Sequence, residues 1–259
     1  MSRESIGKLF SMEGKVALVT GGYRGIGVTV AETYAEAGAD IAIVARNLQG
    51  CQAAAERLQN TYGIKATGKS MDVRDSKSVD RVVQGIADEF GKIDVLVNCA
   101  GIPGSEKPVI KMTDEDLDEV MSVDFRGTFL VSRAVAQIMV RQKSGKIINV
   151  SSILGKVSAR NMTGYCASKA AVLQLTRVMA LELMPDNIQV NAVCPGYFLT
   201  DFNKVFFESE TGKGLIKKMI PMNRVGQVDE LKSLMLYLAT SPTFMTGSDI
   251  CIDGGHTIV

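Results

Sequence analysis

Short runs of apolar, often β-branched residues alternate along this chain with longer stretches in which apolar residues recur at helical spacing. This alternation is typical of parallel strands joined by crossover helices. The pattern predicts strands over residues 16–20, 41–45, 66–71, 95–98, 146–151, 188–193 and 250–252. It predicts helices near residues 25–38, 48–62, 76–90, 114–142, 163–184 and 228–240. We therefore expect an α/β fold, with a doubly wound, seven-stranded parallel sheet and helices on both faces.

The chain of 259 residues contains no internal repeat or linker, and 46% of it is hydrophobic. A chain of this size can bury one sizeable core, so residues 1–259 are expected to form a single domain. Thr113, followed by acidic residues, is a candidate N-cap for the helix over residues 114–142, and Pro185 helps to end the helix over residues 163–184. The least regular stretch, residues 196–223, follows a strand end and is expected to be a substrate lid.

The charges of the chain are nearly balanced. Its net charge is +1, from 29 basic and 28 acidic residues, and there is no run of like charge. This balance favours a small-molecule ligand over nucleic acid or a membrane surface. The first ten residues lack the apolar segment of a secretory signal, and no stretch is apolar enough to span a bilayer. We therefore expect a cytoplasmic protein.

The cysteines and the single histidine do not suggest a metal site. Five cysteines, an odd number without a Cys-x-x-Cys pair, are interpreted as reduced thiols rather than a disulfide framework or zinc site. They are Cys51, Cys99, Cys166, Cys194 and Cys251. His256 cannot form a metal site alone, and we expect it at the surface near the C-terminus.

A glycine-rich segment, Thr20-Gly-Gly-Tyr-Arg-Gly-Ile-Gly27, follows the first predicted strand and begins the first predicted helix. Glycines allow the backbone to approach a pyrophosphate closely, and the helix N-terminus presents free N–H groups to it. Glycine spacing alone is a weak indication, but its position between strand and helix is specific. The sequence therefore predicts a Rossmann-type domain that binds a dinucleotide.

The end of the second strand indicates which dinucleotide is bound. Enzymes that use NAD usually carry an acidic residue there, whereas this chain has Arg46 and Asn47. Arginine can bind a 2′-phosphate through charge-assisted hydrogen bonds, and an acidic side chain would repel it. Arg24, inside the glycine segment, is a second candidate. We therefore expect NADP(H) as the cofactor.

Tyr165 and Lys169 are the residues that indicate a reaction. At positions i and i+4 of a helix they lie on one face, with roughly 5 to 6 Å between their Cβ atoms. A free phenol has a pKa near ~10, and a positive charge about 4 Å away contributes on the order of 4 kcal/mol at an effective dielectric of about 20. The lysine is thus able to lower the pKa of the phenol substantially. Ser152, thirteen residues upstream of Tyr165, adds a hydroxyl that can hold a substrate oxygen.

Together these motifs resemble the short-chain dehydrogenase/reductase family from about Gly14 to the C-terminus. The matching residues occur in the order of the family: Thr20 to Gly27, Asp72-Val73, Asn98 to Gly101, Ser152, Tyr165-x-x-x-Lys169, Asn191, and Pro195-Gly196 with Thr200. The resemblance implies that Tyr165 is the general acid or base, that Lys169 lowers its pKa and holds the nicotinamide ribose, and that Ser152 orients the carbonyl. It also implies a homotetramer. The residues expected to bind the cofactor are Thr20, Gly21, Tyr23, Arg24, Gly25, Ile26, Gly27, Arg46, Asn47, Asp72, Val73, Asn98, Ala100, Gly101, Tyr165, Lys169, Pro195, Gly196 and Thr200.

One position departs from the family pattern. Asp124 stands where the family usually has an asparagine that helps to anchor a water molecule leading to the lysine. Its backbone carbonyl can still hold that water, or its carboxylate can raise the pKa of the lysine and alter the proton relay. Asp124 is therefore a fourth candidate catalytic residue.

The C-terminal part of the chain is similar to family members that act on sugars, both gluconate 5-dehydrogenases and NADPH-dependent sorbose or xylulose reductases. A ketose, polyol or sugar acid is the expected substrate. A sugar acid needs a cation for its carboxylate, and Lys107 and Arg160 are the nearest candidates in sequence. Two alternatives stay open: a 3-oxoacyl-acyl-carrier-protein reductase, which needs a basic docking patch, and an inactive nucleotide-binding sensor or structural subunit.

Overall fold

The computed structural model of the chain describes residues 7–200 and 203–258. Residues 1–6, which belong to the segment expected to lack a secretory signal, lie outside the described residues, as do residues 201–202 of the expected lid. Within the described ranges, no helix is long and apolar enough to cross a membrane.

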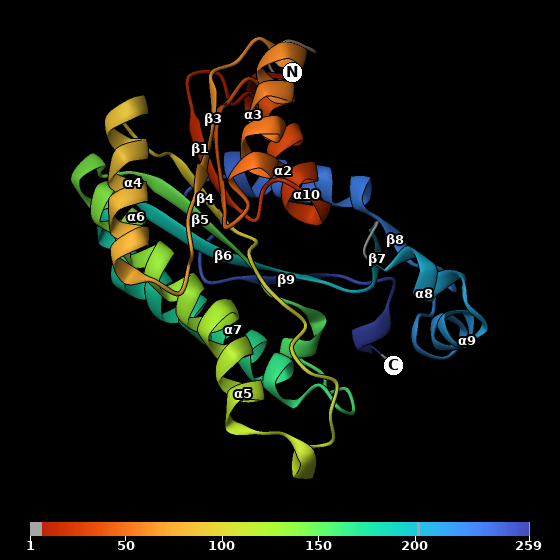
Figure 1. The fold of residues 1–259 in the computed structure, drawn as a ribbon. Coiled ribbons are helices and arrows are strands. Elements are labelled where there is room, and N and C mark those ends of the chain that lie inside the picture. The colour runs from red at the N-terminus through yellow and green to blue at the C-terminus, as the bar shows by residue number, and fades with distance from the viewer. Residues whose placement is uncertain (1–6, 201–202, 259) are drawn as a thin grey trace.

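A seven-stranded parallel sheet forms the centre of the molecule (Figure 1). Its strands are β1 (Val16–Thr20), β2 (Asp40–Ala45), β3 (Ala66–Ser70), β4 (Val95–Asn98), β5 (Gly145–Val150), β6 (Ile188–Pro195) and β9 (Asp249–Ile252). Their order across the sheet is β3-β2-β1-β4-β5-β6-β9, and every neighbouring pair is parallel. The predicted α/β fold class and all seven predicted strands are confirmed. The strand order reverses between β1 and β4, which is where open sheets of this kind bind ligands.

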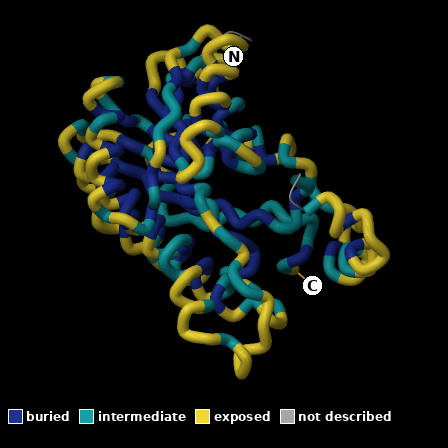
Figure 2. The backbone as a smooth tube through the Cα atoms, viewed as in Figure 1, coloured by how far each residue is buried: buried dark blue, intermediate teal, exposed yellow. Residues whose placement is uncertain are grey.

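Alternate side chains of each strand pack against helices on opposite faces of the sheet. In β1, Ala17 and Val19 pack with α2 (Gly25–Glu36), α3 (Leu48–Tyr62) and α10 (Lys232–Thr240). Leu18 instead packs with α4 (Ser76–Phe90), α6 (Thr128–Gln142) and α7 (Thr163–Leu183). Strands buried on both faces are largely apolar, which explains the apolar runs of β1, β2 and β4 in the sequence. Figure 2 shows the resulting layers, with buried strands inside and exposed helix faces outside.

The helix predicted over residues 114–142 is wrong as a single element. It consists of α5 (Asp114–Val120), a π-helical segment η2 (Met121–Gly127) and α6. The expected N-cap at Thr113 is confirmed, because its side chain accepts a hydrogen bond from Asp116 N and the Asp116 carboxylate accepts one from Thr113 N. π-helical turns of this kind often occur at functional sites.

The stretch over residues 196–223 is more regular than expected. It contains two helices, α8 (Lys204–Glu208) and α9 (Glu210–Met219), and the short strand β7 (Phe198–Leu199), which pairs with β8 (Gly226–Gln227). Ser209 caps α9 by accepting a hydrogen bond from Gly212 N. Figure 1 shows α8 and α9 projecting from the end of the sheet where the C-terminus also lies.

Candidate active site

The glycine segment after β1 forms a tight turn at the N-terminus of α2. Gly21 and Gly25 have positive φ angles of 66° and 54°, which glycine adopts without strain. A β-carbon at Gly27 would overlap the carbonyl oxygen of Gly21. Arg24, at the N-cap of α2, makes no side-chain capping bond, and the first turn contains no acidic residue. The N–H groups of this helix end are therefore available to an anion, as a pyrophosphate requires.

Thr20 ties the glycine segment to the end of β4. Its hydroxyl accepts hydrogen bonds from Cys99 N at 2.9 Å and Ala100 N at 3.0 Å. A β-carbon at Gly21 would lie 3.2 Å from Ala100 Cα, so the two loops are in close contact. Thr20 thus fixes the shape of the loops through buried bonds, and Ile26 packs partly buried against the core below them.

Two arginines lie near the end of β2. Arg46 is exposed, and only its backbone carbonyl accepts a hydrogen bond, from Ser70 Oγ, among the described residues. Asn47 uses its side chain to cap α3, accepting a bond from Gly50 N at 3.0 Å. The Tyr23 ring lies against Gly50, and the guanidinium of Arg24 lies 5.3 Å from the centre of that ring. Arg46 and Arg24 therefore place two cationic groups near the end of β2 and the glycine segment.

Asp72, after β3, is bound to its neighbour Arg74. The Arg74 guanidinium contacts the carboxylate with a shortest distance of 2.6 Å, and this hydrogen bond lowers the pKa of Asp72. Val73 is buried, and a β-carbon at Gly127 would overlap its side chain. The contact between Val73 and Gly127 thus joins the segment after β3 to the π-helical segment η2.

Tyr165 and Lys169 lie on α7, as the helical spacing predicted. The Lys169 ammonium is 5.3 Å from the centre of the Tyr165 ring and donates a hydrogen bond to Val150 O at 3.3 Å. Ser152, which follows β5, is buried, and its hydroxyl accepts a hydrogen bond from Leu154 N at 3.1 Å. Tyr165 packs against the apolar cluster that contains Leu154, in η3 (Ile153–Gly155). The three predicted residues are therefore brought together by α7 and the end of β5.

Asp124 lies within this group. Its Oδ2 is 3.1 Å from Lys169 Nζ, and its Oδ1 accepts a hydrogen bond from Ile102 N at 2.8 Å. The Asp124 side chain is fully buried, and that of Lys169 is 7% exposed. Burial raises the pKa of Asp124 despite the opposing effect of the lysine. Burial also acts to lower the pKa of Lys169, but its electrostatic interactions with Tyr165 and Asp124 outweigh this effect, and the net change is upward.

The loop after β4 covers this ion pair. A β-carbon at Gly101 would lie 3.3 Å from both Lys169 Nζ and Asp124 Oδ2. The Asn98 side chain points into the interior, where its amide donates to Ser132 Oγ at 2.8 Å and to Asn149 Oδ1 at 2.9 Å. Asn98 therefore anchors the loop from the interior, and Gly101 is exposed.

Pro195, Gly196 and Thr200 complete the same edge of the sheet. Pro195 ends β6, and a β-carbon at Gly196 would lie 2.8 Å from Asp253 Cα. A β-carbon at Gly25 would lie 3.8 Å from Thr200 Cγ2, so Thr200 reaches the glycine segment. Asn191, further back in β6, bonds through its side chain to Met245 O and Ser248 N. The predicted residues thus follow one continuous path from the glycine segment to Tyr165.

His256 was predicted at the surface, and this prediction is wrong. The side chain is buried, and the residue is 7% exposed. Its ring lies 5.7 Å from that of Tyr197, which also contacts Phe207. Tyr197 directly follows Pro195-Gly196 but was not among the site residues predicted from the sequence. The burial of His256 depends on contacts with this distant segment, which local sequence patterns do not reveal.

The cations considered for a substrate carboxylate differ in their surroundings. Lys107 Nζ lies 2.7 Å from Asp116 Oδ2 and is therefore engaged in an ion pair. Arg160 is exposed on the loop between Ser152 and Tyr165 and has no ion-pair partner in the described part of the chain. The five cysteines are free thiols, and residues 7–200 and 203–258 contain no cluster of side chains suited to a metal ion.

Comparison with known proteins agrees with this arrangement. Residues 15–211 match the family model described as short chain dehydrogenase. The chain is 37% identical over 245 residues to the 3-oxoacyl-acyl-carrier-protein reductase of Aquifex aeolicus (strain VF5), covering 94% of this chain and 98% of that protein. It is 37% identical over 250 residues to the D-threitol dehydrogenase of Mycolicibacterium smegmatis (strain ATCC 700084 / mc(2)155), covering 96% of this chain and 95% of that protein.

A solved structure shows the same similarity over the whole fold. The crystal structure of a gluconate 5-dehydrogenase from Burkholderia cenocepacia J2315, in complex with NADP and tartrate, superposes with a TM-score of 0.93. The two sequences are 34% identical, and the alignment covers 98% of this chain and 99% of that chain. The predicted resemblance is therefore confirmed: the chain belongs to the short-chain dehydrogenase family and is an oxidoreductase that acts on CH–OH groups.

Proposed function

We propose that this protein transfers a hydride reversibly between NADP(H) and a secondary alcohol or ketone of a ketose, polyol or sugar acid. The observation that carries the proposal is the placement of Tyr165, Lys169 and Ser152 at the edge of the sheet where the glycine segment ends. Family membership supports the class of reaction, and the geometry supports the assignment of these three residues to it.

The cofactor preference follows from charge. The end of β2 carries Arg46 and no acidic side chain, and Arg24 lies nearby on the Tyr23 ring. A 2′-phosphate gains charge-assisted hydrogen bonds from such groups, each worth about 1.5–3 kcal/mol. The similar gluconate 5-dehydrogenase from Burkholderia cenocepacia was crystallised with NADP, which supports the same choice.

When bound, the reduced cofactor supplies the hydride, and the side chains of this chain manage the proton. In reduction, the Tyr165 hydroxyl donates a proton to the substrate oxygen, and in oxidation the phenolate accepts one. Ser152 donates a hydrogen bond that holds the substrate oxygen beside the phenol. Lys169 stabilises the phenolate and holds the nicotinamide ribose, while Asp124 keeps Lys169 protonated inside the protein. Positioned proton transfer of this kind typically contributes ~10² to 10⁴-fold to the rate.

The substrate is small and polar. The D-threitol dehydrogenase and the gluconate 5-dehydrogenase named above are both similar to the chain over nearly its whole length. Among the two cations considered for a sugar acid, Lys107 is neutralised by Asp116 and Arg160 is available. Arg160 is thus left to bind the carboxylate of a sugar acid, whereas a neutral ketose or polyol needs no such cation, and both substrate classes are compatible with the site.

The second candidate function is reduction of a 3-oxoacyl group on a carrier protein. The 37% identity with the Aquifex aeolicus reductase favours it. That activity needs a basic surface at the mouth of the site for the acidic carrier protein. Of the lysines on α9, Lys213 is bound to Glu210, while Lys217 and Lys218 provide positive charge without an ion-pair partner among the described residues.

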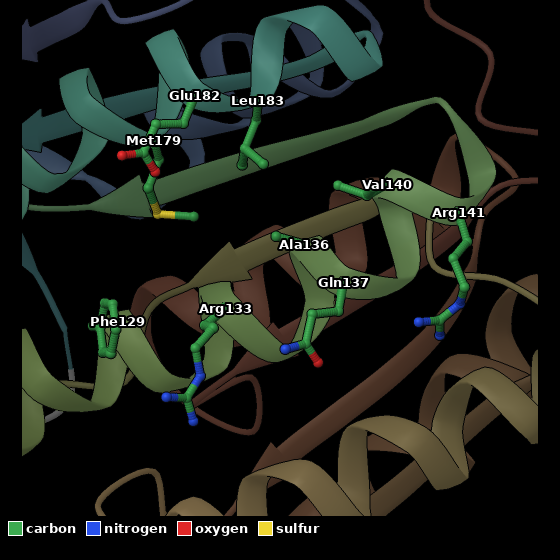
Figure 3. A pocket seen from close by; sticks show the side chains of 9 residues that line it. All are labelled: Phe129, Arg133, Ala136, Gln137, Val140, Arg141, Met179, Glu182 and Leu183. Carbon is green, nitrogen blue, oxygen red and sulfur yellow. The ribbon is translucent and has the colours of Figure 1, made fainter.

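We also propose that the protein is a cytoplasmic homotetramer. Five free thiols are compatible with a reducing compartment. Helices α6 and α7 form the walls of a groove of about 430 Å³ on the molecular surface (Figure 3). Apolar side chains of Phe129, Met179 and Leu183 line it together with Arg133 and Glu182. A second copy covering this groove would bury them, and light scattering should then give four times the chain mass of 27.8 kDa.

The purified protein tests the enzymatic proposal directly. NADPH and NADH consumption is measured with ketogluconate, sorbose, fructose, xylulose and an acetoacetyl thioester. The proposal predicts turnover of at least one sugar substrate with NADPH and weaker turnover with NADH. Turnover of the thioester alone would favour the carrier-protein reductase, and cofactor binding without turnover of any ketone would indicate an inactive sensor or structural subunit.

A further inference from the structure

The buried histidine at the C-terminus lies in a rigid turn. Asp253 accepts hydrogen bonds from Gly255 N at 3.0 Å, Thr257 N at 2.8 Å and Thr257 Oγ1 at 2.7 Å. Gly254 and Gly255 adopt positive φ angles of 63° and 90°, and they turn the chain back after β9. The short helix η6 (His256–Ile258) follows, with His256 at its start. The position of the imidazole is therefore determined by the turn rather than by a flexible tail.

The imidazole of His256 has a polar atom without a partner. Its Nδ1 is buried and makes no hydrogen bond to the described residues, and only 7% of the residue surface is exposed. Buried polar atoms nearly always have a partner, because an unpaired one costs the free energy of its lost hydration. The ring that carries this atom packs against that of Tyr197, with 5.7 Å between the ring centres. Such an atom requires a water molecule or a ligand group.

The aromatic pair Tyr197–His256 lies beside the reacting groups. In the parallel pair β5–β6, Val150 lies opposite Val193. Ser152 and Pro195 each follow these residues by two positions, so they lie at the same level at the carboxyl ends of adjacent strands. Tyr197 follows Pro195 by two residues. Burial raises the pKa of Tyr197, and its electrostatic interactions with Cys166 and Tyr165 act in the same direction. The pair therefore forms part of the wall around the Tyr165 hydroxyl.

The neighbouring charged groups of this wall are already engaged by other residues. Arg224 lines the hollow beside Tyr197 and Asp253, but both of its terminal nitrogens lie 2.7 Å from Glu230 oxygens. The Asp253 carboxylate is used within its own turn. The wall thus offers two hydrogen-bonding groups that are not ion-paired, the imidazole of His256 and the phenol of Tyr197. A hydroxyl group both donates and accepts hydrogen bonds, so it can pair with an imidazole nitrogen whether or not that nitrogen carries a proton.

We infer that His256, supported by Tyr197, hydrogen-bonds to a hydroxyl group of the substrate that is not the reacting one, and so selects polyhydroxylated substrates. This inference rests on the proposed function and narrows its substrate class. It assigns His256 to substrate recognition and leaves proton transfer to Tyr165.

The test compares two kinds of ketone in variants of the full-length protein. His256→Phe keeps an aromatic ring of similar shape and removes both nitrogens. We expect its kcat/KM for xylulose or sorbose to fall about tenfold or more, mainly through KM, because one hydrogen bond to a buried group is lost. With butanone or cyclohexanone, which have no further hydroxyl, the change should stay within about twofold. NADPH affinity, measured by fluorescence, should be unchanged.

Further variants keep the test decisive if His256→Phe does not fold. His256→Gln retains a donor and an acceptor and should recover part of the sugar activity. Tyr197→Phe should impair sugar reduction, whereas Tyr237→Phe, an exposed tyrosine on α10, should not. Equal losses on both kinds of ketone, or no loss on either, would overturn the inference while the wild-type activity still supports the proposed function. A wild-type protein inactive on every ketone would instead refute the proposed function itself.

Discussion

Asp124 and Lys169 form a buried ion pair inside the candidate active site, with Oδ2 3.1 Å from Nζ. Asp124 is carried by the π-helical segment η2, whose widened turn places the carboxylate beneath the loop that contains Gly101. The carbonyl of Asp124 accepts a hydrogen bond from Thr128 Oγ1 at 2.7 Å. The side chain of this residue, and not only its backbone, therefore interacts with the lysine.

Replacing Asp124 with asparagine should shift the pH dependence of reduction. The negative charge of Asp124 helps to hold the pKa of Lys169 above its usual value against the effect of burial. In Asp124→Asn this support is lost, the pKa of Lys169 falls, and the lysine loses its proton at lower pH. The alkaline decline of kcat/KM should therefore begin at lower pH, by about one pH unit or more.

The control is Asp229→Asn, which removes the same charge from an exposed ion pair with Lys232. This variant should keep the wild-type profile. A profile of Asp124→Asn that is unmoved, or moved to higher pH, would show that the carboxylate does not influence Lys169.

Replacing Arg46 with aspartate should change the cofactor preference. The variant loses a cation and gains a charge that repels a 2′-phosphate, so the ratio of kcat/KM for NADPH to that for NADH should fall about tenfold to hundredfold. Lys65→Asp, just before β3 and so at the opposite end of the strands, makes the same charge change and should leave the ratio intact. An unchanged ratio in Arg46→Asp would contradict the assignment.

Two glycine substitutions test the cofactor loop. A methyl group at Gly27 would overlap the Gly21 carbonyl, so Gly27→Ala should displace the loop, lower stability by about 1–3 kcal/mol and weaken NADPH binding. A methyl group at Gly85, within α4, would have no neighbouring atom within 4 Å, so Gly85→Ala should be neutral or stabilising by up to about 1 kcal/mol. Thermal unfolding with and without NADPH measures both effects. Equal stability and equal NADPH response in the two variants would argue against a closely packed loop.

Lys146, in β5, should make stability depend on pH. Burial and the positive charge of Lys15 lower its pKa to about 8, from an ordinary value of 10.5. Between these pH values the unfolded chain holds a proton that the folded chain has released, so folding becomes more favourable as pH rises. The free energy of unfolding of the wild type, relative to Lys146→Met, should rise by about 1–2 kcal/mol from pH 8 to pH 10 after allowance for solvent screening. Urea unfolding at both pH values checks this, and a difference independent of pH would contradict it.

Local patterns in the sequence were sufficient for the sheet and for the placement of Tyr165 and Lys169. Strands β1, β2 and β4 are nearly continuous apolar runs, and the i, i+4 spacing determines which helix face Tyr165 and Lys169 share. The π-helical segment was missed because apolar residues continue through Met121–Gly127 at near-helical spacing. The burial of Asp124 depends on Lys169, which comes from a different helix.

The burial of His256 likewise could not be predicted from local sequence. Asp253, Gly254 and Gly255 indicate a turn locally, but they do not reveal what the next residue contacts. His256 is buried because the turn brings it to Tyr197, which follows a different strand. Helices α8 and α9 were missed because they are short, and glycines at Gly212 and Gly214 weaken the helical pattern of α9.

The most direct test of the catalytic assignment is the turnover of Tyr165→Phe with NADPH and the best ketone substrate. The substitution removes one hydroxyl and leaves the ring beside Lys169 in place. The assignment predicts a fall in kcat of about 100-fold or more, with NADPH affinity and thermal stability close to wild type. A folded Tyr165→Phe protein that retains near-normal turnover would contradict it.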